Sequence, residues 1–361
     1  MPESYDFIIA GAGLAGACAA FSLGTTHSVL LLDTRTPASG ASGISAGLAN
    51  PLMARRARPV WQHDAALRAL HQMLALTGAS SLFQGPAILR PAVDAKQVDF
   101  FQDAARAHPM HASWWSHGAL REAYPAVRTP HGGLLVHTGG AVEIPRMVKA
   151  VIAEACRQGA TFRPHHRVTH WSTEAGSVTV RVETEVGACE VRGGRLILAL
   201  GSGSRHLRAL QSMNLHYVKG QTVHLPPFLE PAFVDYPHLA GRGYVVFAPD
   251  RTVVGSSYEH SFSDDAPSSI QTGRILSKAS SMLPALSSAP IQETQAGIRV
   301  NVPGTRLPML GPLPGQPHVW VFTGLGSKGL LLAPLLALRL LGYIKDPASI
   351  PLEIRVQSDE P

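Results

Sequence analysis

The sequence predicts an α/β fold, in which a Rossmann-like nucleotide-binding domain is interrupted by an inserted antiparallel β-sheet domain. Three observations predict it. The chain opens on an apolar strand, a glycine-rich turn and a helix; residues 215–302 contain mostly short β segments; and a strand, a glycine turn and an apolar helix return near the end. We therefore expect a discontinuous nucleotide-binding domain of residues 1–80, 131–214 and 303–361, and a second domain of residues 81–130 and 215–302.

The opening stretch from Asp6 to Asp33, DFIIAGAGLAGACAAFSLGTTHSVLLLD, has the pattern of a dinucleotide-binding unit. Gly11, Gly13 and Gly16 follow the first strand in G-x-G-x-x-G spacing, and Asp33 ends the second strand. Such glycines permit a tight turn, the close approach of a pyrophosphate and close packing of helix on strand, while the acid accepts hydrogen bonds from a ribose. The first N–H groups of the helix attract phosphate. The alternative is an ordinary strand-to-helix turn.

The remaining elements follow in order along the chain. The loop over residues 36–51 is rich in Gly, Ala and Ser and too long for a simple connection, so it is either a ligand-binding loop or a linker. Apolar spacing predicts helices over 61–76, 145–158 and 270–283. Strands are expected over 132–137, 162–171, 177–182, 187–191, 195–200 and 319–323, with further short strands from 216 to 255.

The apolar run over residues 329–344 is the one segment that resembles a membrane span. It is shorter than the ~20 residues that a bilayer requires and contains Arg339, so we interpret it as a buried helix. The N-terminus has no secretory signal pattern, and Cys18, Cys156 and Cys189 are too few and too scattered for a disulfide framework. We therefore expect a cytoplasmic protein without a membrane span.

The composition is that of a globular protein with a basic balance: 45% of residues are hydrophobic, 16% are charged, and the net charge is +6. A basic balance favours anionic partners. Arg55, Arg56 and Arg58 form one cluster and residues 163–167 another, although each can simply be a solvated surface. The histidines show no metal-ligand spacing of the H-E-x-x-H kind, so no metal site is expected.

Several motifs are similar to those of the D-amino-acid oxidase superfamily of FAD-dependent enzymes, which includes glycine oxidase and sarcosine oxidase. They are GAGLAG with Asp33, GASGISAGLANP, Val218-Lys219-Gly220-Gln221, AGIRVNVPGTRLPMLGP and GLGSKGLLLAP. Within this superfamily, GTRLPMLGP and GLGSKGLLLAPLLA most resemble the flavin domain of the bifunctional enzyme that matures a tRNA wobble uridine. The resemblance implies a glutathione-reductase-like FAD-binding domain, and amine oxidation as the activity.

The resemblance also implies which residues hold FAD. The fingerprint would surround the pyrophosphate, Asp33 would bind the adenosine ribose, and Val168 would meet the adenine through its backbone. No Cys follows Cys189, which argues against covalent attachment of the flavin, so we expect FAD to be held non-covalently. The implied cofactor-binding residues are Gly11, Ala12, Gly13, Leu14, Ala15, Gly16, Asp33, Thr34, Arg35, Ser42, Gly43, Gly47, Leu48, Val168, Gly201, Gly324, Gly326, Ser327, Lys328 and Gly329.

Three residues are candidates for the chemistry itself. Arg299 matches the family's carboxylate-binding arginine, whose guanidinium forms two parallel hydrogen bonds, although it can instead be a structural residue of the sheet. Tyr244 would donate to the same carboxylate or serve only in packing. Lys328, at the start of a helix, would stabilise negative charge on a reduced flavin, unless Gly324–Gly329 is an ordinary turn. Arg306 is a weaker alternative to Arg299.

Three functions are consistent with these residues. The first is oxidation of the C–N bond of a small amine or N-substituted glycine by hydride transfer to flavin N5. The second is the same reaction on carboxymethylaminomethyl-uridine at the wobble position of tRNA, which the basic balance favours. The third is a non-catalytic FAD-binding module. The strand at residues 252–255 lacks the lysine that promotes the oxygen reaction in sarcosine oxidases, so the electron acceptor stays open.

Overall fold

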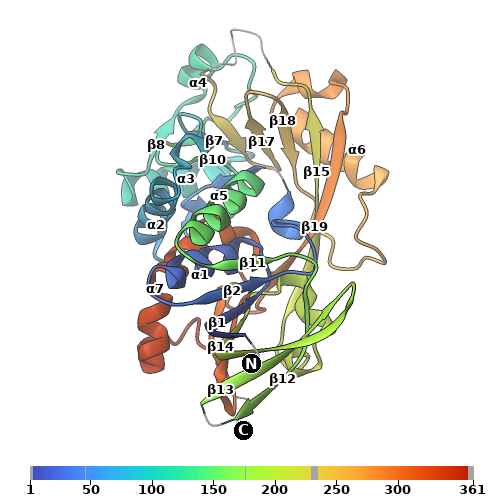
Figure 1. The fold of residues 1–361 in the computed structure, drawn as a ribbon. Coiled ribbons are helices and arrows are strands. Elements are labelled where there is room, and N and C mark those ends of the chain that lie inside the picture. The colour runs from blue at the N-terminus through green and yellow to red at the C-terminus, as the bar shows by residue number, and fades with distance from the viewer. Residues whose placement is uncertain (1–2, 45, 175, 229–234, 357–361) are drawn as a thin grey trace.

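The computed structural model describes residues 3–44, 46–174, 176–228 and 235–356, and these residues form two large β-sheets (Figure 1). The first sheet has a parallel core whose strands are buried and apolar, as expected for strands covered on both faces. In spatial order its parallel strands are β11 (Thr161–Arg163), β2 (Val29–Leu32), β1 (Ser4–Ala10), β14 (Gly187–Leu198) and β21 (Gln316–Thr323). The antiparallel strands β13 (Ser177–Thr184), β12 (Arg167–Glu174) and β20 (Met309–Leu313) extend it.

Apolar side chains alternate between the two faces of this sheet, and different elements cover each face. Phe7 and Ile9 pack into a core with four helices, whereas Ile8 and Ala10 pack against the apolar side chains of β12 and β13. Helices on one face and a β-meander on the other make a three-layer domain (Figure 1). The four helices are α1 (Leu14–Gly24), α2 (His63–Leu76), α5 (Ile144–Arg157) and α7 (Gly329–Lys345).

The C-terminal helix α7 is the apolar segment that the sequence singled out. Together with the preceding 3₁₀ turn, η7 (Gly326–Lys328), it is long and apolar enough to cross a membrane by length and composition alone. However, 67% of its most apolar stretch is buried inside the protein, where it contacts α1 and α2. Burial against two other helices is the property of a core helix, in line with the interpretation from sequence.

The second sheet carries the β-rich segments that the sequence assigned to an inserted domain. Its spatial order is β19 (Glu293–Asn301), β15 (His216–Leu225), β18 (Thr252–Gly255), β17 (Tyr244–Phe247), β16 (His238–Ala240), β7 (Ile88–Pro91), β9 (Gly133–Val136) and β8 (Ala112–Trp115). Neighbouring strands are antiparallel except for β16 and β7, which run parallel. Strand β9 therefore differs from the sequence-based boundary, which placed residues 131–214 in the first domain. Four apolar residues predict a strand but not which sheet it joins.

Two strand boundaries also differ from the expectation, each for a local reason. The segments predicted at 187–191 and 195–200 form the single strand β14, because Gly193 and Gly194 lie against Ile8 and the backbone of Asp6, where a larger side chain would collide. The strand predicted at 162–171 is divided into β11 and β12 at Pro164.

Shorter elements connect and cover the two sheets. Helices α3 (Ala95–Ala107), α4 (His117–Ala123) and α6 (Ser269–Ser280) flank the second sheet. A small sheet joins β3 (Ala46–Ala49), β10 (Gly140–Glu143) and β6 (Phe83–Gln84), and another joins β4 (Leu52–Met53) with β5 (Arg58–Pro59). The 3₁₀ turns are η1 (Ala41–Gly43), η2 (Ser80–Leu82), η3 (Gly201–His206), η4 (Arg208–Leu210), η6 (Pro284–Ser288) and η8 (Pro347–Ser349).

Candidate active site

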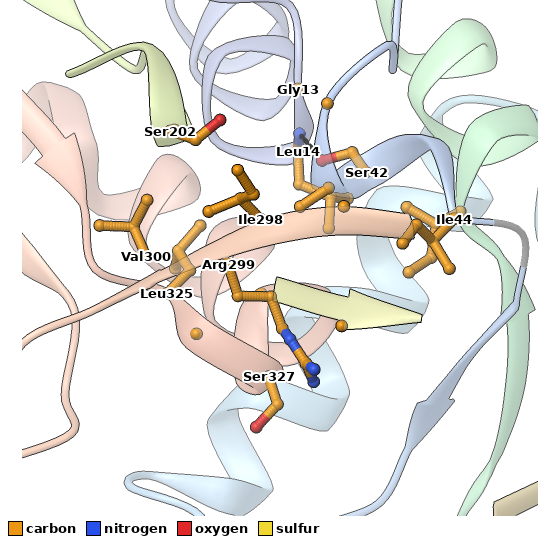
Figure 2. A pocket seen from close by; sticks show the side chains of 18 of the residues that line it. Gly13, Leu14, Ser42, Ile44, Ser202, Ile298, Arg299, Val300, Leu325 and Ser327 are labelled. Carbon is orange, nitrogen blue, oxygen red and sulfur yellow. Dashed lines mark hydrogen bonds between the residues drawn. The ribbon is translucent and has the colours of Figure 1, made fainter. Parts of the chain in front are cut away.

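A cavity of about 1260 Å³ lies between the two sheets (Figure 2). Its wall includes the carboxyl ends of β1, β2 and β21, the turn that follows β14, the loop around η1, and the strand β19. Strand β1 lies between β2 and β14, so the cavity opens at the topological switch point of the parallel sheet, where α/β folds bind their ligands. The volume exceeds the roughly 300–1,000 Å³ of a typical small-molecule pocket. It is large enough for a dinucleotide together with a substrate.

The glycine-rich turn forms one end of this cavity. Gly11 has a φ of +109°, and a Cβ on it would collide with the carbonyl group of Ala199. A Cβ on Gly16 would collide with the carbonyl oxygen of Gly11, so the helix lies directly on the strand. Gly13 is different, because a Cβ on it would meet only the side chain of Ser42, whose hydroxyl would lie at 3.1 Å. The turn thus presents bare backbone to the cavity at Gly13 and is held in shape by the other two glycines.

Asp33, at the end of β2, fastens this turn. Its carboxylate accepts hydrogen bonds from the backbone N–H of Ala12 at 2.6 Å and of Arg35 at 2.9 Å. Oδ1 also accepts from the hydroxyl of Thr34 at 3.5 Å, whereas Oδ2 has a further lone pair, so the group can still accept a hydrogen bond from a ligand in the cavity.

The loop around η1 is folded onto the start of α1. The Ser42 hydroxyl accepts a hydrogen bond from the backbone N–H of Leu14 at 3.0 Å, which caps α1 from 28 residues away (Figure 2). The backbone N–H of Ala38 donates to the carbonyl of Ala12 at 3.1 Å. An ordered loop with these contacts favours the ligand-binding interpretation over a linker.

The turn before α7 brings a second helix start to the cavity. Gly324 and Gly326 have φ values of +74° and +53°, and a Cβ on Gly326 would collide with the side chain of Asn301. Lys328 differs from the expectation: its ammonium donates to the carbonyl of Arg306 at 2.6 Å, and Lys328 is not among the described residues that line the cavity. Burial, and then the nearby Arg306, lower the pKa of Lys328. The start of the helix, rather than this ammonium, faces the cavity.

Most of the other sequence-predicted cofactor residues line the cavity. Ala12, Gly16 and Gly43 do not; they support it from behind, since a Cβ on Gly43 would collide with the carbonyl of Ala38. The predicted residues that do line it are Gly11, Gly13, Leu14, Ala15, Asp33, Thr34, Arg35, Ser42, Gly47, Leu48, Val168, Gly201, Gly324, Gly326, Ser327 and Gly329.

At the opposite end of the cavity lies Arg299, on β19. Figure 2 shows its side chain on the other side of the strand from Ile298 and Val300. The guanidinium carbon lies 4.3 Å from the centre of the Tyr258 ring, and one nitrogen donates to the carbonyl of Ser257 at 2.8 Å. In the part of the chain that the structure describes, no carboxylate forms an ion pair with it. Donors on this guanidinium are therefore available to an anionic ligand.

Tyr244, on β17, lies near the same guanidinium. Its ring packs over Gly255, where a Cβ would meet the phenol. Burial raises the pKa of Tyr244 strongly, nearby Arg299 lowers it to a smaller extent, and Tyr258 raises it. Tyr244 is therefore a neutral phenol at ordinary pH and can donate a hydrogen bond into the cavity.

Sequence reasoning missed several residues of the cavity. Tyr258 is 61% exposed and belongs to an irregular segment with no motif, so only its position beside Arg299 gives it a role. Ser202, in the turn η3, faces the cavity in Figure 2. Basic side chains also line the cavity in excess of acidic ones, which favours anionic ligands. Those that the sequence did not single out include Arg205, Arg242 and Lys278.

A family model described as FAD dependent oxidoreductase, named DAO, matches residues 6–341 of the chain. The chain belongs to this family. The match confirms the family and the enzyme class that the motifs predicted, and it makes FAD the family's cofactor.

Relatives and solved structures agree with this assignment. The tRNA 5-methylaminomethyl-2-thiouridine biosynthesis bifunctional protein of Polaromonas naphthalenivorans is 29% identical over 96% of the chain, which spans 58% of that protein's length. Glycine oxidase of Pseudomonas putida is 25% identical, with 92% of each chain covered. The crystal structure of glycine oxidase from Geobacillus kaustophilus has a TM-score of 0.83 at 21% identity, with 95% of each chain covered. The last comparison shows the same fold and confirms the predicted fold class.

The residues around the cavity fit FAD. The start of α1 carries no acidic residue in its first turn, and Gly13 leaves its backbone open, so two phosphates can approach its N–H groups. Asp33 is placed for a ribose, and the cavity has room for an isoalloxazine ring beyond it. Arg299 lies at the opposite end of the cavity from these residues.

Proposed function

We propose that this DAO-family enzyme oxidises the C–N bond of a small amine that carries a carboxylate, such as an N-substituted glycine. The observation that carries the proposal is Arg299, whose guanidinium lines the cavity with a single hydrogen bond to protein and no acidic partner among the described residues. A guanidinium binds a carboxylate through two charge-assisted hydrogen bonds. The 25% identity to a glycine oxidase supports the same substrate class.

The chemistry follows from the groups in the cavity. When bound, FAD supplies the acceptor, at flavin N5, for a hydride from the carbon next to the substrate nitrogen. The oxidised substrate is an imine, which water hydrolyses to glyoxylate and an amine when the substrate is an N-substituted glycine. The protein need not donate or remove a proton at carbon, because the hydride leaves with both electrons. Its task is to hold the substrate in the orientation that hydride transfer requires.

Three parts of the chain perform that task. Arg299 anchors the carboxylate, and Tyr244 donates its phenolic O–H to it. The buried Ile298 and Val300, on the other side of β19, give the cavity apolar walls. The start of α7 directs the positive end of a helix dipole into the cavity, where it favours the negative charge that a reduced flavin gains.

We also propose that FAD is held without a covalent bond. Cys18 is buried in α1, and burial raises the pKa of its thiol to about 12. Cys156 and Cys189 are exposed, and none of these three cysteines lines the cavity. Denaturation with acid should release all of the yellow colour into the supernatant. Flavin that stays with the precipitated chain would contradict non-covalent binding.

The role of Arg299 is tested by comparing Arg299→Met with Arg306→Met under anaerobic conditions, with N-substituted glycines as substrates. Arg299→Met should lower kcat/KM about 100-fold, as the loss of a charge-assisted anchor predicts, and keep its FAD. Arg306 does not line the cavity, so Arg306→Met should react like the wild type. Equal rates for wild type and Arg299→Met would refute the assignment.

A second candidate substrate is a modified uridine in tRNA. The observation that favours it is the presence of the basic side chains Arg242 and Lys278 at the cavity, together with the 29% identity to a tRNA-modifying protein; Arg205 also lines the cavity but pairs with Asp265 at 3.4 Å. Arg55 and Arg56 are less available, because Arg55 pairs with Asp94 and Arg56 lies over the ring of Phe100. Binding to undermodified tRNA should weaken steeply as salt rises. Undetectable binding at ~50 mM salt would eliminate this substrate.

A further inference from the structure

A cluster of histidine and aspartate side chains lies away from the cavity, where α2 approaches the connection between α3 and β8. His63 and Asp64 are the first two residues of α2, and His111 immediately precedes β8. One potential ligand atom from each of these side chains lies within 4.8 Å of the other two. None of the three lines the cavity, so binding of FAD or of its substrate does not account for them.

His111 has the hydrogen bonds of a metal ligand. Its side chain is only 11% exposed, its Nδ1 lies 2.8 Å from the hydroxyl of Thr138, and its Nε2 lies 2.7 Å from a carboxylate oxygen of Asp64. When the Thr138 oxygen accepts from Nδ1–H, the lone pair of Nε2 points toward Asp64. Metal-bound histidines are held in this way, with one ring nitrogen fixed by a hydrogen bond and the other on the ion.

His63 completes the arrangement from the first residue of α2. Its side chain is 20% exposed, and its ring centre lies 5.0 Å from that of His111 and 5.4 Å from that of His108. Two imidazoles and one carboxylate therefore meet, with the ring of His108 beside His63, at a site that solvent can reach through Asp64, which is 55% exposed.

We propose that His63, Asp64 and His111 bind a Zn²⁺ ion, with water or His108 in the fourth position. Two imidazoles and a carboxylate are a common zinc ligand set. In a tetrahedral site, bonds of ~2.0–2.1 Å place the ligand atoms about 3.3 Å apart. Side-chain rotations that move the ligand atoms by roughly 1–2 Å would bring them to this spacing. The positive end of α2 opposes a cation, and the negative charge of Asp64, in the same first turn, offsets it.

The site escaped the sequence because its ligands are 47 residues apart, and His108-x-x-His111 alone is not a known ligand pattern. Its position suggests what the ion does. α2 belongs to the helical layer of the first domain and β8 to the second sheet, so Zn²⁺ would tie the two domains together. It should therefore stabilise the folded protein without contacting the flavin.

The experiment uses the FAD-loaded, 361-residue protein after treatment with EDTA. Binding of ZnCl₂ is measured by calorimetry, and stability by thermal unfolding. We expect one Zn²⁺ per chain, and a rise in Tm of about 3 °C at a 100-fold excess over Kd. His63→Gln and Asp64→Asn should each weaken binding about 100-fold. Thr138→Val, which changes only the partner of His111, should weaken it about 10-fold.

The control is His71→Gln, on the same helix, where the histidine contacts Phe83 rather than the cluster. It should bind Zn²⁺ like the wild type. The flavin absorbance of each variant reports whether it is folded. Absence of saturable binding to wild type, or equal binding by wild type, His63→Gln and Asp64→Asn when all keep their flavin, would overturn the proposal.

Discussion

The two ends of the cavity are formed by different groups, backbone at one end and side chains at the other. At the end proposed to hold the nucleotide, the wall is mostly backbone: Gly11 and Gly16 let strand and helix approach each other, and the N–H groups of α1 face the cavity. At the end proposed to hold the substrate, the wall is formed by side chains: Arg299, Tyr244 and Tyr258 come from two strands and a loop. The first end is encoded within one short stretch of chain. The second depends on the register of a sheet.

This difference has consequences for substitution. The glycine-rich turn does not tolerate an added Cβ at Gly11 or Gly16, because the colliding groups are backbone carbonyls that cannot rotate away. A site made of side chains can be altered one residue at a time, since each contributes separately to binding. We expect stability to be lost at the nucleotide end and specificity to change at the substrate end.

The largest effect is expected for Gly16→Ala, because its Cβ would collide with the carbonyl of Gly11. Unfolding in urea should show a loss of about 3 kcal/mol, and the protein should lose FAD. The control is Gly273→Ala in the middle of α6, where a Cβ meets nothing within 4 Å; it should gain up to about 1 kcal/mol from helix propensity. If both substitutions had the same effect, the contrast between the two ends would fail.

A second prediction concerns the second sheet, where the burial of His238 should make folding stability depend on pH. This buried histidine lies 3.0 Å from the carbonyl of Gln84 and accepts from the N–H of Phe247 at 3.2 Å, and burial lowers its pKa to about 4. The unfolded chain, with a histidine pKa of about 6.5, takes up the proton first. Stability from this group is therefore complete above pH 6.5 and is lost as the pH falls toward 4, by about 2–3 kcal/mol at pH 4.5.

The measurement is the urea midpoint at pH 7 and pH 4.5 for wild type and His238→Gln. The wild type should lose about 2 kcal/mol more than the variant over this interval, because glutamine does not titrate. An equal loss in both proteins would show that other groups are responsible.

A smaller effect is expected for Ser42→Ala, which removes the cap that a distant loop places on α1. The free energy of FAD binding should become less favourable by about 1 kcal/mol, which is roughly a five-fold weaker affinity in a fluorescence titration. Ser39→Ala, in the same loop, removes a hydroxyl that bonds to the carbonyl of Thr36 instead, and it should leave the affinity unchanged. Equal affinities for Ser42→Ala and wild type would mean that the cap is not used.

The smallest effect is expected for Lys328→Met. Because the ammonium is bonded to the carbonyl of Arg306, the reduction potential of the flavin should change little, and the helix start should supply most of the stabilisation. A fall of about 30 mV or more would instead restore the role that the sequence suggested for this lysine, since it corresponds to about 1.4 kcal/mol.

Local backbone features could be predicted from the sequence, whereas contacts between distant segments could not. The strand, glycine turn and helix at residues 6–33 were recognisable, because each step depends on neighbours within a few residues and on hydrogen bonds along the chain. The placement of β9 in the second sheet was not, since four apolar residues fit any buried strand. Tyr258 could not be found either, because its contact with Arg299 is made between a loop and a strand about 40 residues further on.

The sequence by itself determined that this chain belongs to the DAO family of FAD-dependent oxidoreductases, because glycines, buried runs and an acid at fixed spacing have local physical meaning. Only the tertiary structure decided where the charged side chains point. It directed Lys328 to a carbonyl, left Arg299 without an acidic partner among the described residues, and brought His63, Asp64 and His111 together. The physical reason is that a long side chain is positioned by whatever the folded sheets and loops place beside it, and those neighbours are distant in the chain.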